Sequence, residues 1–263
     1  MQDRHNNRRK YFNEQANTTR DYYINYLKKH IDVSHNLRVL EIGCGEGGNL
    51  LPFAELGCYV KGIDISQTRI EQARMFFKEL NVDADFLCGN FISTHKPPLV
   101  EDRFDIVLIH DVIEHIEPQH KVEFIDNLKP FLRHNAVIFF GFPAWQNPFG
   151  GHQQITQGFA SKLPFIHILP NPIYRRLLKL SNVSQKAIDE LMSIKCSRMT
   201  IEKFEKLISA EGFSIINRLL WFINPHYKQK FGLKPRPVWK WASYIPYFRN
   251  YYTTSAFYLI KIS

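Results

Sequence analysis

The chain has 263 residues, enough for one well-packed core with a small appended element, and carries a formal net charge of +9 at pH 7. Its hydrophobic content of 44% and charged content of 22% are those of a globular protein, and no apolar stretch approaches the roughly 20 residues that span a bilayer. The polar N-terminus lacks the apolar core of a signal peptide, and four scattered cysteines show neither metal-ligand spacing nor a disulfide framework, so we expect a reduced, cytoplasmic protein.

Strands and helices alternate through the first 142 residues. Tyr11, Phe12 and Ala16 recur at helical spacing near the N-terminus. The continuous apolar run over 104–109 is typical of a strand that is buried on both faces. The predicted order is a helix over about 8–30, a strand over 38–42, a helix over 49–56, a strand over 59–63, a helix from Ser66 to Leu80 with Ile70, Ala73, Phe77 and Leu80 facing inward, strands over 84–88 and 104–109, a helix over about 120–132, and a strand over 136–140.

The alternation ends after Phe142. Residues 143–198 contain five prolines and an apolar, hairpin-like stretch over 163–170. An apolar, proline-stiffened insertion next to a ligand-binding edge predicts a lid or substrate-recognition element. A helix with Thr200 as its N-cap is expected over 200–211, and the last two strands are expected over 213–223 and 255–262.

Strand–helix–strand units of this length predict parallel strands with right-handed crossovers, which together make a doubly wound α/β sheet. Such sheets bind ligands beyond the carboxyl ends of their strands. Glu41, Asp64, Asn90 and His110 all lie at or just past predicted strand ends. The sequence therefore predicts one ligand site at this edge of the sheet.

A glycine-rich turn follows the first strand, in the run Val-Leu-Glu-Ile-Gly-Cys-Gly-Glu-Gly over 39–47. With Gly48 the turn also fits the dinucleotide fingerprint, but the carboxylate of Glu41 would repel a pyrophosphate and suits a cation such as the ammonium of an amino-acid ligand. The run resembles the first motif of class I S-adenosylmethionine (SAM)-dependent methyltransferases. That motif pairs an acidic residue with a G-x-G-x-G turn, which here consists of Gly43, Gly45 and Gly47.

The resemblance covers about residues 35–142 and extends loosely to the last helix and strands. It implies one class I methyltransferase domain over 1–263, with a seven-stranded, mostly parallel sheet whose last strand is antiparallel. The implied parts are an N-terminal helical extension over 1–34, a SAM-binding core over 35–142, a lid insertion over 143–198, and a C-terminal helix and strand pair over 199–263.

Cofactor contacts follow partly from chemistry and partly from the resemblance. A carboxylate at the end of the second strand, Asp64, can accept hydrogen bonds from two ribose hydroxyls. Asn90 stands where relatives usually have an aspartate that meets the adenine, and its amide can both accept and donate. The predicted cofactor-binding residues are Glu41, Gly43, Cys44, Gly45, Gly47, Asp64, Ile65 and Phe91 as flanks of the adenine, Asn90, and His110 through its backbone.

The stretch His-Asp-Val-Ile-Glu-His over 110–115 resembles the D-V-x-E-H signature of many members of the family. Asp111, Glu114 and His115 also resemble the metal site of ubiquinone-pathway O-methyltransferases and small-RNA 2′-O-methyltransferases, with His152 as the added ligand. The same string is common in relatives without a metal, and Asp111 replaces the usual glutamate, so a divalent metal is not favoured. Without a metal, His115 and His152 are the candidate general bases.

The predicted function is methyl transfer from SAM to an oxygen or nitrogen of a small molecule or of a glycan or lipid intermediate. The alternatives are an RNA 2′-O-methyltransferase, a non-catalytic SAM-binding protein and a nicotinamide-dependent oxidoreductase; Glu41 argues against the last. Positive charge gathers at both ends of the chain, and aromatic residues interleave with Lys228, Lys230, Lys234, Arg236 and Lys240. This C-terminal pattern predicts peripheral contact with an anionic membrane surface, binding of a phosphorylated substrate or a solvated basic rim, and a nucleic-acid partner is disfavoured.

Overall fold

A single mixed sheet of eight strands organises the chain in the computed structural model, which describes residues 7–93, 103–156 and 158–263. The strand order is β3-β2-β1-β4-β5-β8-β6-β7. The strands are β1 (Arg38–Ile42), β2 (Tyr59–Asp64), β3 (Asp85–Cys88), β4 (Phe104–His110), β5 (Leu132–Phe142), β6 (Phe213–Ile223), β7 (Arg236–Pro237) and β8 (Ser255–Ile262). The prediction of a doubly wound, mostly parallel sheet is confirmed, and the additional eighth strand is the two-residue β7.

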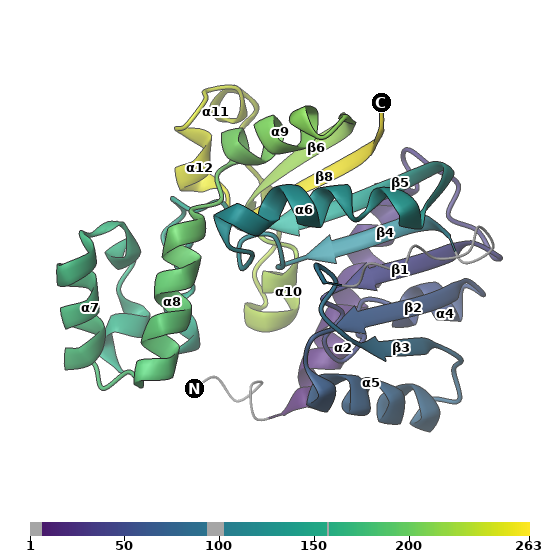
Figure 1. Cartoon of the computed structure of the whole chain (residues 1–263), viewed down its shortest axis with the longest axis horizontal. Coiled ribbons are helices and arrows are strands. Elements are labelled where there is room, and N and C mark those ends of the chain that lie inside the picture. The colour runs from purple at the N-terminus through teal and green to yellow at the C-terminus, as the bar shows by residue number, and fades with distance from the viewer. Residues whose placement is uncertain (1–6, 94–102, 157) are drawn as a thin grey trace.

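Parallel pairing holds from β3 to β5, and β8 runs antiparallel to both β5 and β6. The antiparallel direction of the last strand was expected from the resemblance. In Figure 1 the arrowheads of β2, β3 and β4 point towards the side of the molecule where α7 (Asn171–Leu180) and α8 (Gln185–Ser197) lie. The carboxyl ends of these strands therefore face the segment that follows β5.

Helices cover both faces of the sheet, because β1, β4 and β5 are apolar on both sides. One core cluster joins the sheet to α6 (Lys121–Asp126) and α9 (Ile201–Ala210). The other joins it to α2 (Arg8–Thr18), α3 (Ile24–Leu27), α4 (Leu51–Glu55) and α5 (Gln67–Glu79). On α5 the predicted inward residues Ile70, Ala73 and Phe77 are buried, but Leu80 is exposed and Phe76 is buried instead.

The N-terminal helix begins at Arg8 as predicted and ends at Leu27, a few residues earlier than expected. The Asn7 side chain caps it by accepting from Lys10 N at 2.9 Å. Between α2 and α3 the chain makes a wide π-helical turn over Thr19–Tyr23. Such turns are frequent at functional sites, and this one directs Tyr23 towards the end of β4.

Two predicted boundaries near β5 were wrong. The helix expected over about 120–132 ends as α6 at Asp126, and a 3₁₀ turn over Lys129–Phe131 follows. Pro130 cannot continue an α-helix, so the chain enters β5 at Leu132 rather than at Ala136. The longer strand carries its buried run out to Phe142.

The segment over 143–198 folds as short 3₁₀ turns followed by α7 and α8. The hairpin-like reading of 163–170 was wrong, because this stretch contains a 3₁₀ turn over Ile166–Ile168 and leads into α7. A small separate cluster that includes Tyr174, Leu178 and Leu191 holds the two helices together. The segment thus has an apolar core of its own beside the carboxyl ends of the strands (Figure 1).

The C-terminal part returns to the sheet. Thr200 caps α9 by accepting from Lys203 N, as expected, and β6 and β8 have the predicted bounds. Between these strands lie α10 (His226–Phe231), α11 (Lys240–Ser243) and α12 (Arg249–Tyr252). Among the described residues, no helix combines the length and apolar character required to cross a membrane.

Candidate functional site

The glycine turn between β1 and α4 depends on left-handed backbone conformations. Gly43, Gly45 and Gly47 have φ of +74°, +54° and +80°. A Cβ on Gly43 would also lie 2.4 Å from Cγ2 of Val112, so no other residue fits there without displacing that side chain. The neighbouring Cys44 is buried, its N–H donates to Ile63 O and its carbonyl accepts from Gly47 N, so its contact with a cofactor stays a prediction.

Glu41 lies beneath this turn and is 1% exposed. Its Oε1 accepts from Asn49 Nδ2 at 2.6 Å, and Asn49 Oδ1 in turn accepts from Thr19 Oγ1 at 2.9 Å. Oε2 of Glu41 has no hydrogen-bond partner within the described part of the chain. Burial raises the pKa of Glu41 to about 8, although the Asn49 hydrogen bond works in the opposite direction. The free oxygen can therefore accept from a cationic donor.

Asp64 ends β2 and is nearly buried. Its Oδ2 accepts from Gly45 N and its Oδ1 accepts from Ser66 N, both at 2.8 Å. These bonds hold the glycine turn against β2 and leave each oxygen a second lone pair. Ile65, the next residue, is 73% exposed and offers an apolar surface directly beside the carboxylate.

The residues after β3 differ in what they offer to a ligand. Asn90 is exposed, and its Oδ1 accepts from Ile92 N at 3.0 Å, which leaves the side-chain NH₂ directed elsewhere. Phe91 is 5% exposed, and its ring packs against Phe124 and Phe131 in the core. The contacts of Phe91 are those of a core residue, and its part in flanking an adenine stays a prediction.

The end of β4 is held by the N-terminal helix. Nε2 of His110 lies 2.8 Å from the Tyr23 hydroxyl, and the two rings stack with centroids 5.2 Å apart. Nδ1 of His110 lies 3.3 Å from Oδ2 of Asp111, which has a left-handed φ of +54°. Desolvation raises the pKa of Asp111, but the neighbouring imidazoles, His110 above all, lower it well below its usual value. An ionised carboxylate therefore stands at this point.

Three of the predicted metal or base residues meet just beyond β4. Ligand atoms of Glu114, His115 and His152 all lie within 4.8 Å of one another. Oε1 of Glu114 lies 3.7 Å from His152 Nε2 and 4.0 Å from His115 Nε2. His152 arrives from the segment after β5, where it adopts a left-handed φ of +57°. Asp111, the fourth candidate, is not part of this group.

The pKa values of Glu114 and His152 in this cluster are shifted away from their usual values. Burial and the charge of Asp111 raise the pKa of Glu114 well above its usual value, and burial together with His115 lowers that of His152 to about 4. Neither Glu114 oxygen nor Nε2 of His152 has a hydrogen-bond partner among the described residues. Carboxylate oxygens and an imidazole nitrogen that have no hydrogen-bond partner are the kinds of atom that ligate a cation.

A cavity of about 380 Å³ is lined by Asp111, His115 and His152, whereas the buried Glu114 does not line it. Its walls come from α2, α5, α8, α10 and the segment after β5. The lining residues on α2, α5 and α10 carry no motif, and only Tyr11 among them was a predicted part of the wall. They include Arg8, which pairs with Glu46 of the glycine turn at 3.2 Å, Tyr11, Arg69, His226 and Lys230.

A second cavity of about 430 Å³ shares Thr254 with the first. Its other lining residues are almost all aromatic: Pro148, Phe165, Phe222, Phe248, Tyr251 and Tyr252. A polar cavity with the titratable cluster therefore borders an aromatic cavity. Such a pair suits a ligand with one polar end and one apolar end.

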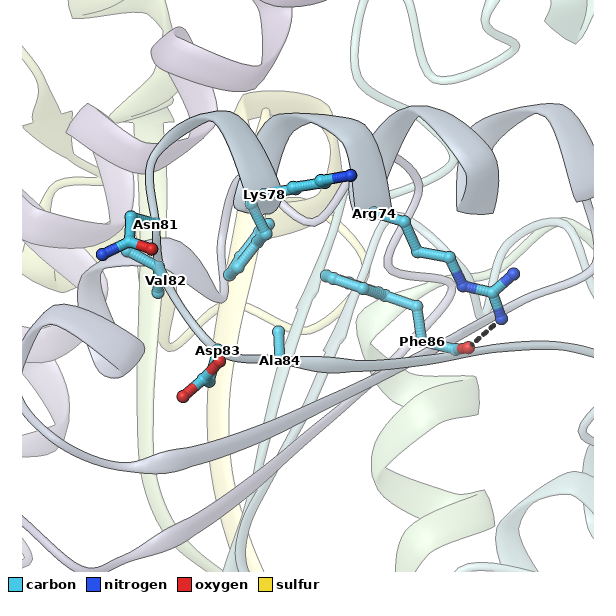
Figure 2. Close-up of a pocket in the computed structure, with 8 residues that line it drawn as sticks. Arg74, Lys78, Asn81, Val82, Asp83, Ala84 and Phe86 are labelled. Atoms are coloured by element: carbon cyan, nitrogen blue, oxygen red, sulfur yellow. Dashed lines mark hydrogen bonds between the residues drawn. The ribbon is translucent and has the colours of Figure 1, made fainter.

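A third hollow, of about 290 Å³, lies between the C-terminal half of α5 and the start of β3. Figure 2 shows Arg74 donating to the carbonyl of Phe86 on one side, with Asn81 and Asp83 on the other. The loop over 81–84 precedes β3, so this hollow opens at the amino end of that strand. It lies away from the strand ends where the glycine turn is found.

Comparison with known proteins gives a match to a family described as a methyltransferase domain, over residues 39–135. A ubiquinone biosynthesis O-methyltransferase of Rickettsia canadensis is 31% identical over 117 residues, which are 44% of this chain and 47% of the relative. One from Rhodopseudomonas palustris is 39% identical over 88 residues, 34% of this chain and 33% of the relative. The chain thus spans less than half the length of these curated relatives.

Solved structures share the fold across nearly the whole chain. Magnesium protoporphyrin IX methyltransferase from Synechocystis, with bound S-adenosylhomocysteine (SAH), has a TM-score of 0.56 at 15% identity. The match covers 95% of this chain and 84% of that chain. A SAM-dependent methyltransferase from Clostridium acetobutylicum has a TM-score of 0.59 at 10% identity, with 94% and 92% covered. The domain match and the shared fold confirm the predicted resemblance to class I methyltransferases.

Proposed function

We propose that this chain, whose residues 39–135 form a methyltransferase domain of the class I SAM-dependent type, transfers a methyl group from SAM to a hydroxyl oxygen of a small molecule. The observation that carries the proposal is the meeting of the glycine turn, the unpartnered Glu41 oxygen and Asp64 at the carboxyl ends of β1 and β2. Oxygen as the target atom is supported by the curated relatives, which are named O-methyltransferases.

Residues in and around the turn would each contact one part of SAM. Oε2 of Glu41 accepts from the ammonium of the methionine part, and Asp64 accepts from the ribose hydroxyls. Ile65 lies against one face of the adenine, while the Asn90 amide meets its edge. Arg8 and Arg69, in the wall of the polar cavity, supply positive charge for the methionine carboxylate.

Methyl transfer from a sulfonium requires alignment rather than a covalent intermediate. The sulfonium is already a good leaving group, so the protein has to hold the acceptor oxygen, the methyl carbon and the sulfur in line and exclude water. The segment over 143–198 borders the cavity and brings His152 into it, which fits the predicted role of a lid. The acceptor hydroxyl still has to lose a proton during the transfer.

The cluster of Glu114, His115 and His152 would accept the proton that the acceptor hydroxyl loses. The pKa of His152 is lowered to about 4, so its ring is neutral at pH 7; the residue lines the cavity, and its buried Nε2 lies 3.7 Å from Oε1 of Glu114. One carboxylate and two imidazoles also fit a divalent transition-metal ion better than Mg²⁺, which prefers oxygen ligands. When bound, such an ion would lower the pKa of an acceptor hydroxyl. The geometry adds weight to the metal that the sequence did not favour.

Metal binding can be tested without an acceptor. Titration of the purified protein with Co²⁺, followed by its visible absorption, should give one site, and Glu114→Gln should weaken it at least tenfold, because removing a ligand removes a direct bond. Glu123→Gln, an exposed carboxylate on α6, is the matched control. If wild type and Glu114→Gln bind Co²⁺ equally, the cluster is not a metal site, and His152 keeps only the role of base.

The aromatic cavity indicates the acceptor class. Because it borders the polar cavity at Thr254, an acceptor with its hydroxyl near the cluster can extend an apolar ring or chain between Phe222 and Tyr252. This supports an acceptor from the small-molecule or lipid part of the predicted range rather than from the glycan part. The contact predicted between the basic aromatic C-terminal segment and a membrane surface fits the same acceptor class.

Calorimetric titration with SAH tests the cofactor assignment. Wild type should bind at micromolar concentration, and Asp64→Ala should lose at least tenfold in affinity, because two hydrogen bonds to a carboxylate are removed. Asp83→Ala, on the exposed loop before β3, should bind as wild type does. NADH serves as the negative ligand.

The outcomes separate the alternatives. A folded wild type that binds NADH but not SAH would sink the methyltransferase proposal. SAH binding without turnover on any hydroxylated acceptor would leave the non-catalytic SAM-binding protein. Methylation of RNA with a steep salt dependence would point to the RNA 2′-O-methyltransferase.

A further inference from the structure

Almost all of the net charge of the protein lies in its last 52 residues. Residues 212–263 contain eight lysines and arginines and no aspartate or glutamate, whereas the whole chain has a net charge of +9. Two of the eight, Arg218 and Arg249, pair with glutamates of α9 and serve the fold. Lys234, Arg236 and Lys240 are exposed and form no ion pair with an acidic side chain among the described residues.

The same segment exposes large apolar side chains. Trp241, Tyr244 and Tyr247 are 63%, 65% and 68% exposed, and Trp239 and Phe248 are also exposed. These residues lie on or beside α11 and α12, at an outer corner of the molecule next to α9 (Figure 1). An exposed group of this kind marks an interaction surface. We call the five aromatic residues together with Lys234, Arg236 and Lys240 the aromatic corner.

A buried polar network fixes the aromatic corner in place. Oε1 of Glu202 on α9 accepts from Tyr247 N at 2.8 Å and from Arg249 Nε at 3.0 Å. Oε2 of the same carboxylate accepts from Asn250 Nδ2 at 2.7 Å. The chain between α11 and α12 is therefore held on its inner side by charge-assisted bonds, which leaves the rings of Tyr247 and Phe248 facing outward.

The aromatic corner is continuous with the aromatic cavity. The ring of Phe248 lies 4.9 Å from that of Tyr252 and 6.5 Å from that of Trp241. Trp239 contacts Phe222, another cavity residue, with ring centroids 5.2 Å apart. An apolar molecule bound at the corner would thus reach the cavity along a path of aromatic rings.

We infer that the aromatic corner docks on the surface of an anionic lipid bilayer. Tryptophan and tyrosine prefer the interface between headgroups and acyl chains, where their apolar rings are buried and their polar atoms stay hydrated. Lysine and arginine beside them are attracted to anionic headgroups. A single-stranded nucleic acid would instead need a basic groove that follows its backbone, and the cavity beside the aromatic corner is lined by aromatic residues.

The inference deepens the proposed function, because docking here would open the aromatic cavity towards the membrane and let a lipid-borne acceptor enter from it. Only the entry of a lipid-borne acceptor rests on the proposed function. Lipid binding itself is independent of SAH, so each can fail without the other.

Vesicle flotation with the full chain tests the docking. The protein should float with vesicles of phosphatidylcholine and phosphatidylglycerol, and at least tenfold more weakly with phosphatidylcholine alone. The triple variant Trp241→Ala, Tyr244→Ala, Tyr247→Ala should lose at least tenfold in partitioning. Phe159→Ala, an exposed aromatic outside the aromatic corner, should not.

Charge reversal provides a second, matched pair of variants. Each basic side chain near an anionic surface contributes about fivefold to partitioning, so reversal of Lys234, Arg236 and Lys240 to glutamate should abolish flotation. Lys28 and Lys29 are exposed just after α3, and Lys78 is exposed on α5; reversal of these three changes the net charge equally and should leave most of the binding. SAH affinity should be unchanged in both variants, which shows that they are folded.

Three results would overturn the inference. The first is equal flotation of the corner variants and their controls, and the second is no flotation of a wild type that binds SAH. The third is tighter binding of single-stranded RNA than of vesicles, lost in the same corner variants, which would assign the surface to nucleic acid.

Discussion

Proton release from Glu41 on cofactor binding follows from the burial of this carboxyl group. Its pKa is about 8 in the folded protein against a usual 4.5, so at pH 7 the group holds a proton in about nine molecules of ten. The ammonium of the cofactor, placed against the unpartnered Oε2, favours the charged form. Binding of SAH at pH 7 should therefore release close to one proton from Glu41.

Calorimetry in several buffers measures this release. The observed heat of SAH binding at pH 7 should vary with the ionisation enthalpy of the buffer, with a slope close to one released proton per site. In Glu41→Gln, which keeps the size of the side chain and its hydrogen bond with Asn49, the release should disappear. Glu55→Gln, an exposed carboxylate on α4, is the control and should behave as wild type does.

The same pKa predicts how stability depends on pH without any ligand. A group whose folded pKa is raised binds its proton more tightly in the folded state, so its contribution is complete below pH 4.5 and is lost as the pH rises towards 8. Between pH 5 and pH 7 the loss is about 2–3 kcal/mol. Urea unfolding at both values should show Glu41→Gln gaining that amount relative to wild type.

Two findings would refute this reasoning. One is a heat of binding that does not depend on the buffer in a wild type that binds SAH. The other is a stability difference between wild type and Glu41→Gln that stays constant from pH 5 to pH 7. Either result would mean that the carboxyl group is already ionised in the free protein.

Two further predictions concern stability, and urea unfolding measures both. Gly43→Ala should destabilise the fold by about 2–4 kcal/mol, because it combines a left-handed φ with a Cβ only 2.4 Å from Val112. Adding Val112→Ala should recover the part of this loss that is due to the clash but not the part that is due to φ. Arg249→Ala should cost about 1.5–3 kcal/mol, because the buried guanidinium donates to the partly buried Glu202 and Glu205 of α9. Lys228→Ala, which breaks an exposed pair, should cost less than about 1 kcal/mol, and similar costs for both would contradict the assignment of Arg249 to a buried network.

The strands β1, β4 and β8 were well predicted because burial on both faces of a sheet leaves a continuous apolar run, and β6 was also predicted although it is only partly buried. The bounds of β1, β6 and β8 were given to the residue. The prediction of secondary structure failed where the apolar side chains of a helix are buried on one side only, against a neighbouring segment. The helices α7 and α8 pack on each other through a small cluster and were not predicted, and the hairpin-like reading of 163–170 before them was wrong.

The candidate site was predicted in its parts but not in its contacts. The glycine turn, Glu41 and Asp64 were found because their spacing follows the strand ends. Asn49, which donates to Glu41, and Tyr23, which contacts His110, carry no motif and act only through contacts made in the folded chain. Phe91 shows the converse, since its position predicted a ligand contact and its ring packs in the core.

The sequence by itself determined the sheet, the glycine turn and the type of cofactor, because these depend on local pattern: apolar runs, glycines that allow left-handed backbone, and acidic residues at strand ends. Only the tertiary structure decided that Glu41 is buried with one oxygen unpartnered, that His152 meets Glu114 and His115, and that an aromatic cavity opens beside them. Burial, donor geometry and cavity shape come from segments that are distant in sequence. Each of them exists only after the chain has folded.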